Sequence, residues 1–298
     1  MKVLVAGSSG LIGRSLTARL RAEQHTVVRL VRRPASAPDE SAWDPYAGHV
    51  DRAHVASADV VVNVAGASLL ANPHSRKWAA RMRDSRVLTT RTLARAIADV
   101  GGGPAFLAGN GSSVYGDHGT EPVTEHSDSR GDALLTRIAR EWEDATRPAA
   151  DAGSRVCVLR TAPVADRRNP LYRLQVPLFR RGLGARLGSG EQHFPLVSLR
   201  DWIGAALHLA AHPSATGAFN ICCPETPTNA EYTRALADAV GGRAILAIPA
   251  PLLRLAGGMM APEMLNSINL RPAALLASGY RFADPDVRSV LDAALNPG

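Results

Sequence analysis

The chain begins with the stretch Val3-Leu4-Val5-Ala6-Gly7-Ser8-Ser9-Gly10-Leu11-Ile12-Gly13, in which a glycine-rich turn directly follows a short apolar run. Leu11, Leu16 and Leu20 continue beyond the turn at the spacing of one helix face. We therefore predict a buried strand over 2–6, a tight turn and a helix over 11–23. Such a turn presents backbone N–H groups and a helix N-terminus to a pyrophosphate, although a purely structural turn would have the same form. The predicted dinucleotide-binding residues of the turn are Gly7, Ser8, Ser9, Gly10, Leu11, Ile12 and Gly13.

The same alternation of apolar strands and helical stretches continues to about residue 165. Further strands are expected at 26–31, 60–64, 105–108 and 156–159, and further helices at 76–99 and 132–152. Continuous apolar strands that alternate with helices indicate a parallel sheet covered on both faces. The predicted fold class is α/β, a doubly wound Rossmann sheet, with its ligand crevice at the carboxyl ends of the strands where the strand order reverses.

The pattern changes after residue 165, where we expect a smaller C-terminal substrate lobe. A Gly/Arg-rich segment at 180–188 is predicted as a loop or flap, and the last part of the chain is predicted to hold two further helices. A helix over 201–211, a short strand over 218–221 and a helix over 229–240 are also expected. The predicted organisation is a dinucleotide-binding domain over 1–165 and a lobe over 166–298 that is partly interleaved with the sheet.

Composition narrows the class of protein. The 298 residues are 46% hydrophobic and suffice for one large α/β domain with a small lobe. The net charge of +7 comes almost entirely from scattered arginines, without a basic tail or a nucleic-acid motif, so we expect no nucleic-acid partner. No apolar run is long enough to span a membrane. Three cysteines, Cys157, Cys222 and Cys223, predict neither a disulfide framework nor a metal site, which fits a reducing cytoplasm.

The end of the second strand indicates which dinucleotide is bound. Sites that prefer NAD place an acidic residue there to hold the ribose hydroxyls, whereas this chain has Arg32 and Arg33. A guanidinium can pair with a 2′-phosphate through two hydrogen bonds, so we predict NADP(H). The alternative is that both arginines are solvated and that Asp44 binds the ribose from a loop.

Two more strand ends carry candidate site residues. The small residues after the third apolar strand are expected to line the cofactor, although close packing of a strand end would need the same residues: Asn63, Val64, Ala65 and Gly66. After the 105–108 strand, a serine hydroxyl can hydrogen-bond a substrate carbonyl and the phenol of Tyr115 can donate a proton. A Gly/Ser turn with a packed tyrosine is the alternative interpretation.

Taken in order, these segments and others resemble the extended type of the short-chain dehydrogenase/reductase superfamily, and more closely its atypical, sugar-nucleotide epimerase-like branch. The matching segments span nearly the whole chain: Gly7 to Gly13, Trp43-Asp44-Pro45, Asn63 to Gly66, Asp84-Ser85-Arg86, Thr89-Thr90, Val114 to Asp117, Glu141 to Glu143, Leu159 to Thr161, Gly182 to Gly190 and Thr228 to Glu231. The resemblance implies a Rossmann domain that binds NADP(H) and a C-terminal lobe for a small substrate.

The chain departs from the superfamily in its catalytic residues. The usual Tyr-x-x-x-Lys pair is absent, and Leu135 and Ala139 are expected at its positions, which removes the standard proton transfer. The branch also lacks this pair. The serine turn is one residue shorter than is usual in the branch, so either Ser112 or Ser113 takes the serine role.

Several residues are candidates for the missing acid or for anchoring. His193 would titrate near neutrality and lies in a segment of altered composition expected to face the substrate. Glu141, as a buried carboxylate, and Asp117-His118 are the other candidate acids. Arg86 is a candidate phosphate or substrate anchor. The ligand crevice at the end of the 156–159 strand is expected to be lined by Arg160, Thr161 and Pro163.

The sequence thus predicts an NADP(H)-dependent oxidoreductase or epimerase-like enzyme acting on a small substrate, with a role in specialised metabolism suggested by the altered 192–201 segment. The first alternative is a non-catalytic NADP(H)-binding regulator or sensor, and the second is a structural or assembly protein with an inert site. We expect a cytoplasmic protein without a membrane partner. Extended members often pair through helices that correspond to 76–99 and 132–152, so a homodimer is expected by analogy.

Overall fold

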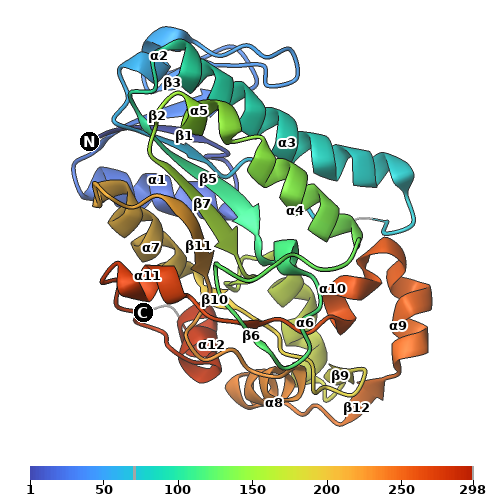
Figure 1. Cartoon of the computed structure of the whole chain (residues 1–298). Helices are drawn as coiled ribbons and strands as arrows, with labels where there is room; N and C mark the ends of the chain where they lie inside the picture. Colours follow the sequence, from blue (N-terminus) through green and yellow to red (C-terminus); the bar gives the residue numbers. More distant parts are fainter. Residues whose placement is uncertain (70–71, 297–298) are drawn as a thin grey trace.

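A seven-stranded parallel sheet organises the computed structural model, which describes residues 1–69 and 72–296 (Figure 1). The strand order is β11-β7-β5-β4-β1-β2-β3. The strands are β1 (Lys2–Ala6), β2 (Thr26–Val31), β3 (Glu40–Ala42), β4 (Val60–Asn63), β5 (Ala105–Gly111), β7 (Val156–Thr161) and β11 (Gly217–Ile221). The order reverses between β1 and β4, as the predicted Rossmann topology requires.

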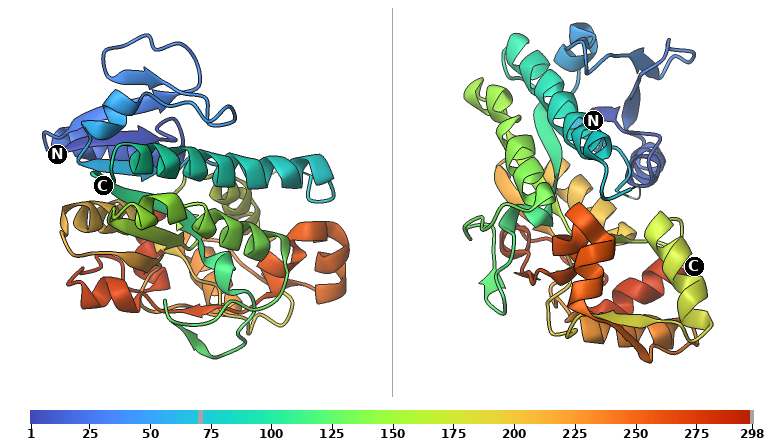
Figure 2. Two further views of the ribbon diagram at one scale, coloured as in Figure 1. Left: turned by 45° about the horizontal axis from the view of Figure 1, so that its top comes forward. Right: turned by 90° about the vertical axis from the view of Figure 1, so that its right-hand side faces the viewer.

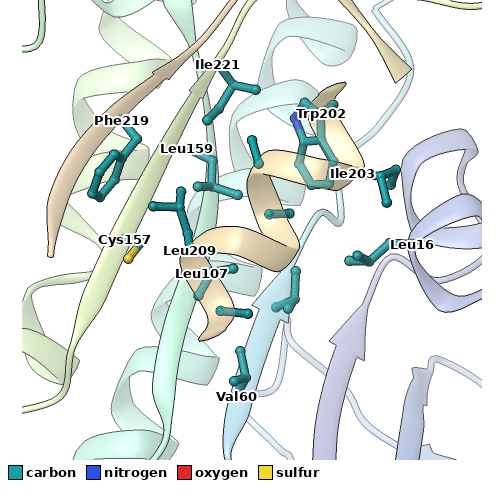
Figure 3. Close-up of a cluster of buried hydrophobic side chains, with 14 of the residues drawn as sticks. Leu16, Val60, Leu107, Cys157, Leu159, Trp202, Ile203, Leu209, Phe219 and Ile221 are labelled. Carbon is teal, nitrogen blue, oxygen red and sulfur yellow. The ribbon is translucent and has the colours of Figure 1, made fainter. Parts of the chain in front are cut away.

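Helices cover both faces of the sheet. One face packs against α1 (Leu11–Ala22) and α7 (Leu199–Ala211) through a cluster that includes Leu16, Leu107 and Trp202 (Figure 3). The other face packs against α2 (Arg52–Ala56), α3 (Arg76–Asp99) and α5 (Arg147–Asp151). Val3 and Val5 of β1 face the first cluster while Leu4 and Ala6 face the second, which is the two-residue alternation of a strand buried on both sides.

The remaining elements form a lobe beyond the carboxyl ends of the strands (Figure 2). Its core joins α6 (Pro170–Arg180), α8 (Asn229–Ala239) and α12 (Val287–Leu295) around Tyr172 and Tyr232. The other helices are α4 (Leu134–Asp144), α9 (Ala250–Gly257), α10 (Ala261–Leu265), α11 (Ala273–Ala277) and the 3-10 turns η1 (Ser112–Tyr115) and η2 (Gly258–Met260). Three two-stranded pairs complete the structure: β8 (Val164–Ala165) with β10 (Val197–Ser198), β9 (Ala185–Leu187) with β12 (Leu246–Ile248), and β6 (Pro122–Val123) with β13 (Asn269–Leu270).

The predicted fold class is confirmed, and the differences are local. The helix predicted over 132–152 is two helices, α4 and α5, the second of which has Pro148 in its first turn. The segment 180–188, predicted as a loop, contains strand β9, which pairs with β12. Residues 250–296, the part after Pro249 that the structure describes, contain four α-helices rather than two. Two of the four have five residues each, which is too short for a helical period to be visible. None of the described helices is long and apolar enough to cross a bilayer.

Residues 199–221 return from the lobe to the sheet, and one buried carboxylate holds this return in place. The side chain of Asp201, which is 1% exposed, accepts hydrogen bonds from the Tyr280 hydroxyl (2.9 Å) and from the backbone N–H groups of Ala283 (2.9 Å) and Asp284 (2.8 Å). It therefore ties the first turn of α7 to the segment that precedes α12.

Replacing this carboxylate is expected to destabilise the protein. Asp201→Ala removes the acceptor of the buried Asp284 N–H and of the part-buried Ala283 N–H, and it removes one of the two acceptors of the Tyr280 hydroxyl. The expected cost is about 3 kcal/mol of unfolding free energy. Asp238→Ala, at an exposed position of α8, is the control and should change the free energy by less than about 0.5 kcal/mol. Urea denaturation measures both changes, and equal stabilities of the two variants would contradict this account of Asp201.

Candidate functional site

The glycine turn between β1 and α1 is in backbone contact with the end of β4. Gly7 has φ of +83°, and a Cβ atom there would lie 2.6 Å from the backbone of Val64 and Ala65. A Cβ atom on Gly13 would lie 2.1 Å from the Gly7 carbonyl oxygen. The close approach of these backbones therefore excludes side chains at both positions, as expected for a dinucleotide-binding turn.

The N-terminus of α1 offers hydrogen-bond donors to a ligand. Its N-cap residue is Gly10, and no side chain caps the first turn. The N–H groups of a first helical turn have no acceptor within the helix and carry the positive end of the helix dipole. In the described part of the chain, the hydroxyls of the neighbouring Ser8 and Ser9 have no hydrogen-bond partner. The turn therefore has the free donors that an anion-binding helix N-terminus needs, and the sequence-based prediction of a pyrophosphate site there stays a prediction.

The segment after β4 is joined to α3 through two side chains. The Asn63 amide, buried at the end of β4, donates to Thr90 Oγ1 (2.8 Å), and its carbonyl oxygen accepts from the Ala65 N–H (3.1 Å). Arg86 donates to the Ala67 carbonyl oxygen (3.2 Å), and its guanidinium lies 3.3 Å from the position of a Cβ on Gly66. The structure thus brings together the glycine turn, residues 63–66 and Arg86.

Arg86 is an unusual cation because no carboxylate pairs with it among the described residues. Its guanidinium stacks over the Trp142 ring at 5.4 Å, and the Trp142 Nε1 donates to Thr90 Oγ1 (2.7 Å). Burial lowers the pKa of Arg86 to about 10. A partly buried positive charge held between an aromatic ring and a glycine is a natural anchor for an anionic ligand.

The two arginines after β2 differ in their contacts. Arg33 forms two hydrogen bonds to the carboxylate of Glu40, at 2.7 and 2.9 Å. This pairing raises the pKa of Arg33, and the opposite effect of desolvation is smaller. Arg32 is exposed and makes no hydrogen bond or ion pair with any residue of the described ranges. Asp44, the alternative ribose ligand, accepts from the backbone N–H groups of Tyr46 and Ala47 in its own turn.

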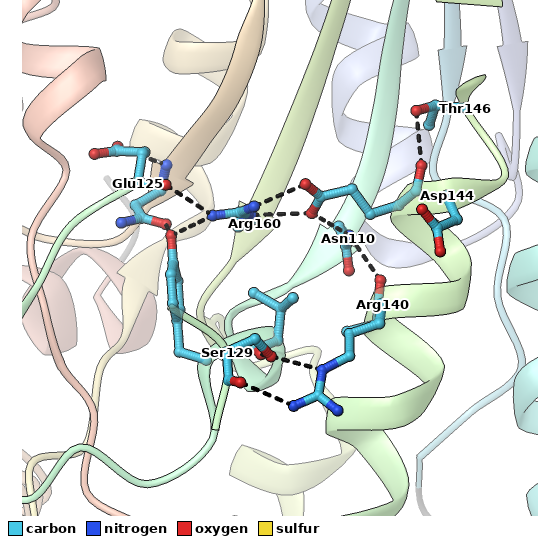
Figure 4. A network of polar contacts seen from close by, with 12 residues as sticks. Asn110, Glu125, Ser129, Arg140, Asp144, Thr146 and Arg160 are labelled. Atoms are coloured by element: carbon cyan, nitrogen blue, oxygen red, sulfur yellow. Dashed lines mark hydrogen bonds and ion pairs between the residues drawn. The ribbon is translucent and has the colours of Figure 1, made fainter. Parts of the chain in front are cut away.

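Arg160 lies in a polar network (Figure 4) that joins it to Glu143 of α4 and to Tyr115. The Tyr115 hydroxyl donates to Asn220 Oδ1 (2.7 Å) and accepts from Arg160 Nη1 (2.8 Å), and burial raises the pKa of Tyr115 to about 12. Arg160 is also bound to both carboxylate oxygens of Glu143 (2.7 and 3.0 Å). The hydrogen bonds of the phenol and the guanidinium are thus made within the protein, so the geometry favours structural roles for both.

The two candidate serines lie in η1, after the carboxyl end of β5. Ser113 donates from Oγ to the Glu263 carboxylate (2.7 Å), whereas Ser112 is a buried residue whose hydroxyl has no hydrogen-bond partner among the described groups. Ser113 therefore sits in a polar contact between the sheet and the C-terminal lobe. At the neighbouring strand end, Thr161 accepts from Trp202 Nε1 (3.1 Å) and Pro163 is exposed.

The candidate acids are spread over different parts of the molecule. Burial and the nearby Arg271 lower the pKa of His193, whose Nδ1 lies 3.4 Å from Ser267 Oγ in the lobe. The expectation that Glu141 is a buried carboxylate is wrong, since Glu141 is 44% exposed and pairs with Arg83 on the surface. His118 is buried and lies 3.2 Å from the Asp128 carboxylate, and Asp117 accepts from the Ser267 N–H. In the parts of the chain that the structure describes, no group of three or more potential ligands could hold a metal ion.

The sequence analysis missed Glu263, Glu143 and Asn220. Each acts through a partner that is distant in sequence, and Ser113 and Glu263 are separated by 150 residues. No local pattern marks these positions, because an isolated polar residue beside a helix has no characteristic spacing. The one signal was the matching segment Glu141 to Glu143, which contains Glu143 but gave it no role.

A family model confirms what the turn, the strand order and the β4 contact indicate. The NAD dependent epimerase/dehydratase model matches residues 3–222. The chain belongs to that family. A second model, a domain of unknown function named DUF1731, matches residues 248–294 and so includes Glu263.

Named members of this epimerase family align with nearly the whole chain. Epimerase family protein Mb2239 of Mycobacterium bovis is 38% identical over 298 residues, which is 99% of this chain and 98% of the relative. The human epimerase family protein SDR39U1 is 31% identical and covers 98% of both chains. The crystal structure of human SDR39U1 (isoform 2) with NADPH covers all of both chains, with a TM-score of 0.89 and 30% identity. The predicted resemblance to the atypical extended short-chain dehydrogenase/reductases is thereby confirmed.

The contact at Gly7 leads to a stability prediction with an internal control. Gly48 also has positive φ (+74°), but a Cβ atom there meets nothing within 4 Å. Gly48→Ala should cost about 1 kcal/mol from backbone strain, whereas Gly7→Ala adds the backbone clash and should cost about 2 kcal/mol more. Thermal and urea unfolding of both variants measure the difference, and equal losses would contradict the close contact between the turn and β4.

Proposed function

We propose that the protein is an NADP(H)-dependent oxidoreductase of the extended short-chain dehydrogenase/reductase type that acts on a small substrate. The observation that carries the proposal is the uncapped N-terminus of α1 beside a turn in which Gly7 and Gly13 leave no room for side chains. This arrangement fits a pyrophosphate, and the residues of the turn fit the cofactor without rearrangement of a capping side chain.

The preference for NADP(H) is supported by charge at the end of β2. Arg32 has no described partner, whereas Arg33 is held by two hydrogen bonds to Glu40, whose side chain is only 2% exposed. A 2′-phosphate would give Arg32 the anion that it lacks and would compete with Glu40 for Arg33. The human relative, which is similar over its whole length, is crystallised with NADPH.

The other residues have roles around the reactive end. Bound NADPH supplies the hydride. We assign Arg86 to an anionic group of the cofactor or substrate, because its charge is otherwise uncompensated. Asn63, Val64, Ala65 and Gly66 would line the cofactor through their backbone, and Thr161 and Pro163 would border the nicotinamide. Ser113 would hold a substrate carbonyl oxygen through its hydroxyl.

One observation favours the alternative, a non-catalytic NADP(H)-binding regulator or sensor. We expect Leu135 and Ala139 at the positions of the usual acid–base pair; Leu135 packs in an apolar cluster, and Ala139 is buried. Neither side chain can move a proton. Turnover of the cofactor separates the two functions, since a sensor would bind NADPH without oxidising it.

Cofactor preference is tested by removing the free cation. Arg32→Ala should weaken NADPH binding by about tenfold or more, as expected for the loss of a hydrogen bond to a charged group, and leave NADH binding unchanged. Arg19→Ala, on the exposed side of α1, is the matched control. Calorimetric titration with both dinucleotides gives the affinities, and an equal loss for NADPH and NADH would contradict a 2′-phosphate contact.

The role of Arg86 is tested by comparing affinity with stability. Arg86→Met should weaken NADPH binding by about tenfold while leaving the unfolding free energy unchanged or higher, because it removes an uncompensated, partly buried charge. Arg95→Met, on the exposed face of the same helix, should change neither quantity. A variant that loses stability but retains affinity would show that Arg86 is structural.

A further inference from the structure

Ser113 and Glu263 form a contact that joins the two parts of the chain at the candidate site. Ser113 follows β5, whose Ala108 is paired with Asn63 at the edge where the glycine turn also lies. Glu263 belongs to α10 in the C-terminal lobe, and the distance from Ser113 Oγ to Glu263 Oε2 is 2.7 Å. The lobe thus delivers a carboxyl group to the hydroxyl that follows the β5 end.

Glu263 is partly exposed, and α10, which carries it, follows a turn that packs in an apolar cluster. The turn η2, which precedes α10, contributes Met259 and Met260 to this cluster. The buried members of the cluster are Trp78, Met82 and Ile138. In Figure 1, α9 and α10 lie beside the end of α4 at which this cluster forms. No arginine, lysine or histidine of the described chain forms an ion pair with Glu263. Burial raises the pKa of the Glu263 carboxyl, and the hydrogen bond from Ser113 offsets only part of this effect.

The charges on the packed elements are engaged elsewhere. Arg83 of α3 pairs with Glu141 of α4 at 2.6 Å, and Arg86 stacks on Trp142. His74 contacts Gly258 in η2, and Arg254 of α9 is exposed. None of these groups contributes to the pKa of Glu263. Its pKa is set by burial, which raises it, and by the hydrogen bond from Ser113, which lowers it.

We propose that Glu263 is the proton reservoir of Ser113 during reduction of a carbonyl substrate, so that the Glu263–Ser113 pair takes the place of the absent Tyr/Lys pair. The inference rests on the proposed oxidoreductase function. Because Glu263 acts through Ser113, it is a positioning residue for that hydroxyl. Protonated Glu263 donates to Ser113 Oγ, which leaves the Ser113 hydroxyl hydrogen free to donate to the substrate oxygen.

The step is balanced in atoms and electrons. A dihydronicotinamide dinucleotide supplies a hydride to the carbonyl carbon and is itself oxidised. The C=O π bond breaks, and the carbonyl oxygen takes the proton of the Ser113 hydroxyl as the new O–H bond forms. Ser113 Oγ receives the proton of Glu263, and the resulting carboxylate is reprotonated from solvent.

The experiment compares the intact wild-type protein with Glu263→Gln, Glu263→Asp and the control Glu191→Gln, which removes an exposed carboxylate of the same lobe. Infrared difference spectra over a pH titration report the C=O stretch of a protonated carboxyl group without any substrate. Oxidation of NADPH with phenanthrenequinone and with a nitrobenzaldehyde as carbonyl probes gives kcat, KM and the pH profile. NADPH affinity is measured in parallel.

The proposal predicts a protonated carboxyl band that persists to a pH above the usual range of a glutamate, is absent in Glu263→Gln and is present in Glu191→Gln. It predicts that kcat falls at least tenfold in Glu263→Gln with unchanged NADPH affinity, and that Glu263→Asp restores part of it. In the wild type, kcat should fall as pH rises through a value above the usual range of a glutamate, because the acid form is the active one. That limb should be missing in Glu263→Gln.

Three outcomes overturn the inference in distinguishable ways. A wild-type protein that oxidises NADPH, together with a Glu263→Gln variant of equal kcat and pH profile, contradicts the role of Glu263 alone. A wild-type protein that binds NADPH but oxidises it with neither probe contradicts the proposed reductase function, and the proton reservoir with it. Loss of the infrared band in Glu191→Gln would also contradict the assignment of the protonated group to Glu263.

Discussion

The contact between two backbones, at Gly7 and at Val64–Ala65, is the constraint on which the candidate site depends. It fixes the start of α1 against the end of β4, next to the point where the strand order reverses. The next strands extend beyond this point: Asn63 pairs with Ala108 of β5, and β5 and β7 then continue side by side to the pair Gly111–Thr161. A bulkier residue at Gly7 would therefore disturb more than one loop.

Charged side chains of two kinds surround this edge. Arg160 and Glu143 are fully paired and bind the Tyr115 hydroxyl into a network that connects β7, α4 and the 112–115 turn. Arg86 and Glu263 have no countercharge among the described residues, and both are partly buried. Uncompensated buried charge is costly in a folded protein and is tolerated where a ligand completes the pairing or where a proton must be held. This difference separates the residues that stabilise the fold from those assigned to the site.

The sequence predicts the features that depend on local spacing. The apolar run, the turn and the helical repeat of residues 3–20 are enough to predict β1, α1 and the nucleotide-binding edge, because backbone geometry imposes those periods. The residues at the β4 end and Arg86 are found by the same topology. Tyr115 and Arg160 show the limit of this approach, since their positions at strand ends suggest contact with ligand while Glu143 and Asn220 occupy their polar atoms. The assignment of Glu263 to the site could not be predicted from the sequence, because it rests on a contact with Ser113, which is 150 residues away along the chain.

The most direct test of the proposed oxidoreductase function is hydride transfer from NADPH that carries deuterium at the transferred position. The protein is incubated with this cofactor and a metabolite extract, and mass spectrometry follows the mass of every small molecule. The account predicts that at least one compound gains a single deuterium in the presence of the protein and fails to gain it when the Gly7→Ala variant replaces the wild type. If the wild-type protein binds NADPH and no compound acquires the label, the protein is not an oxidoreductase of the extract's metabolites, and a cofactor-sensing role would replace the proposed one.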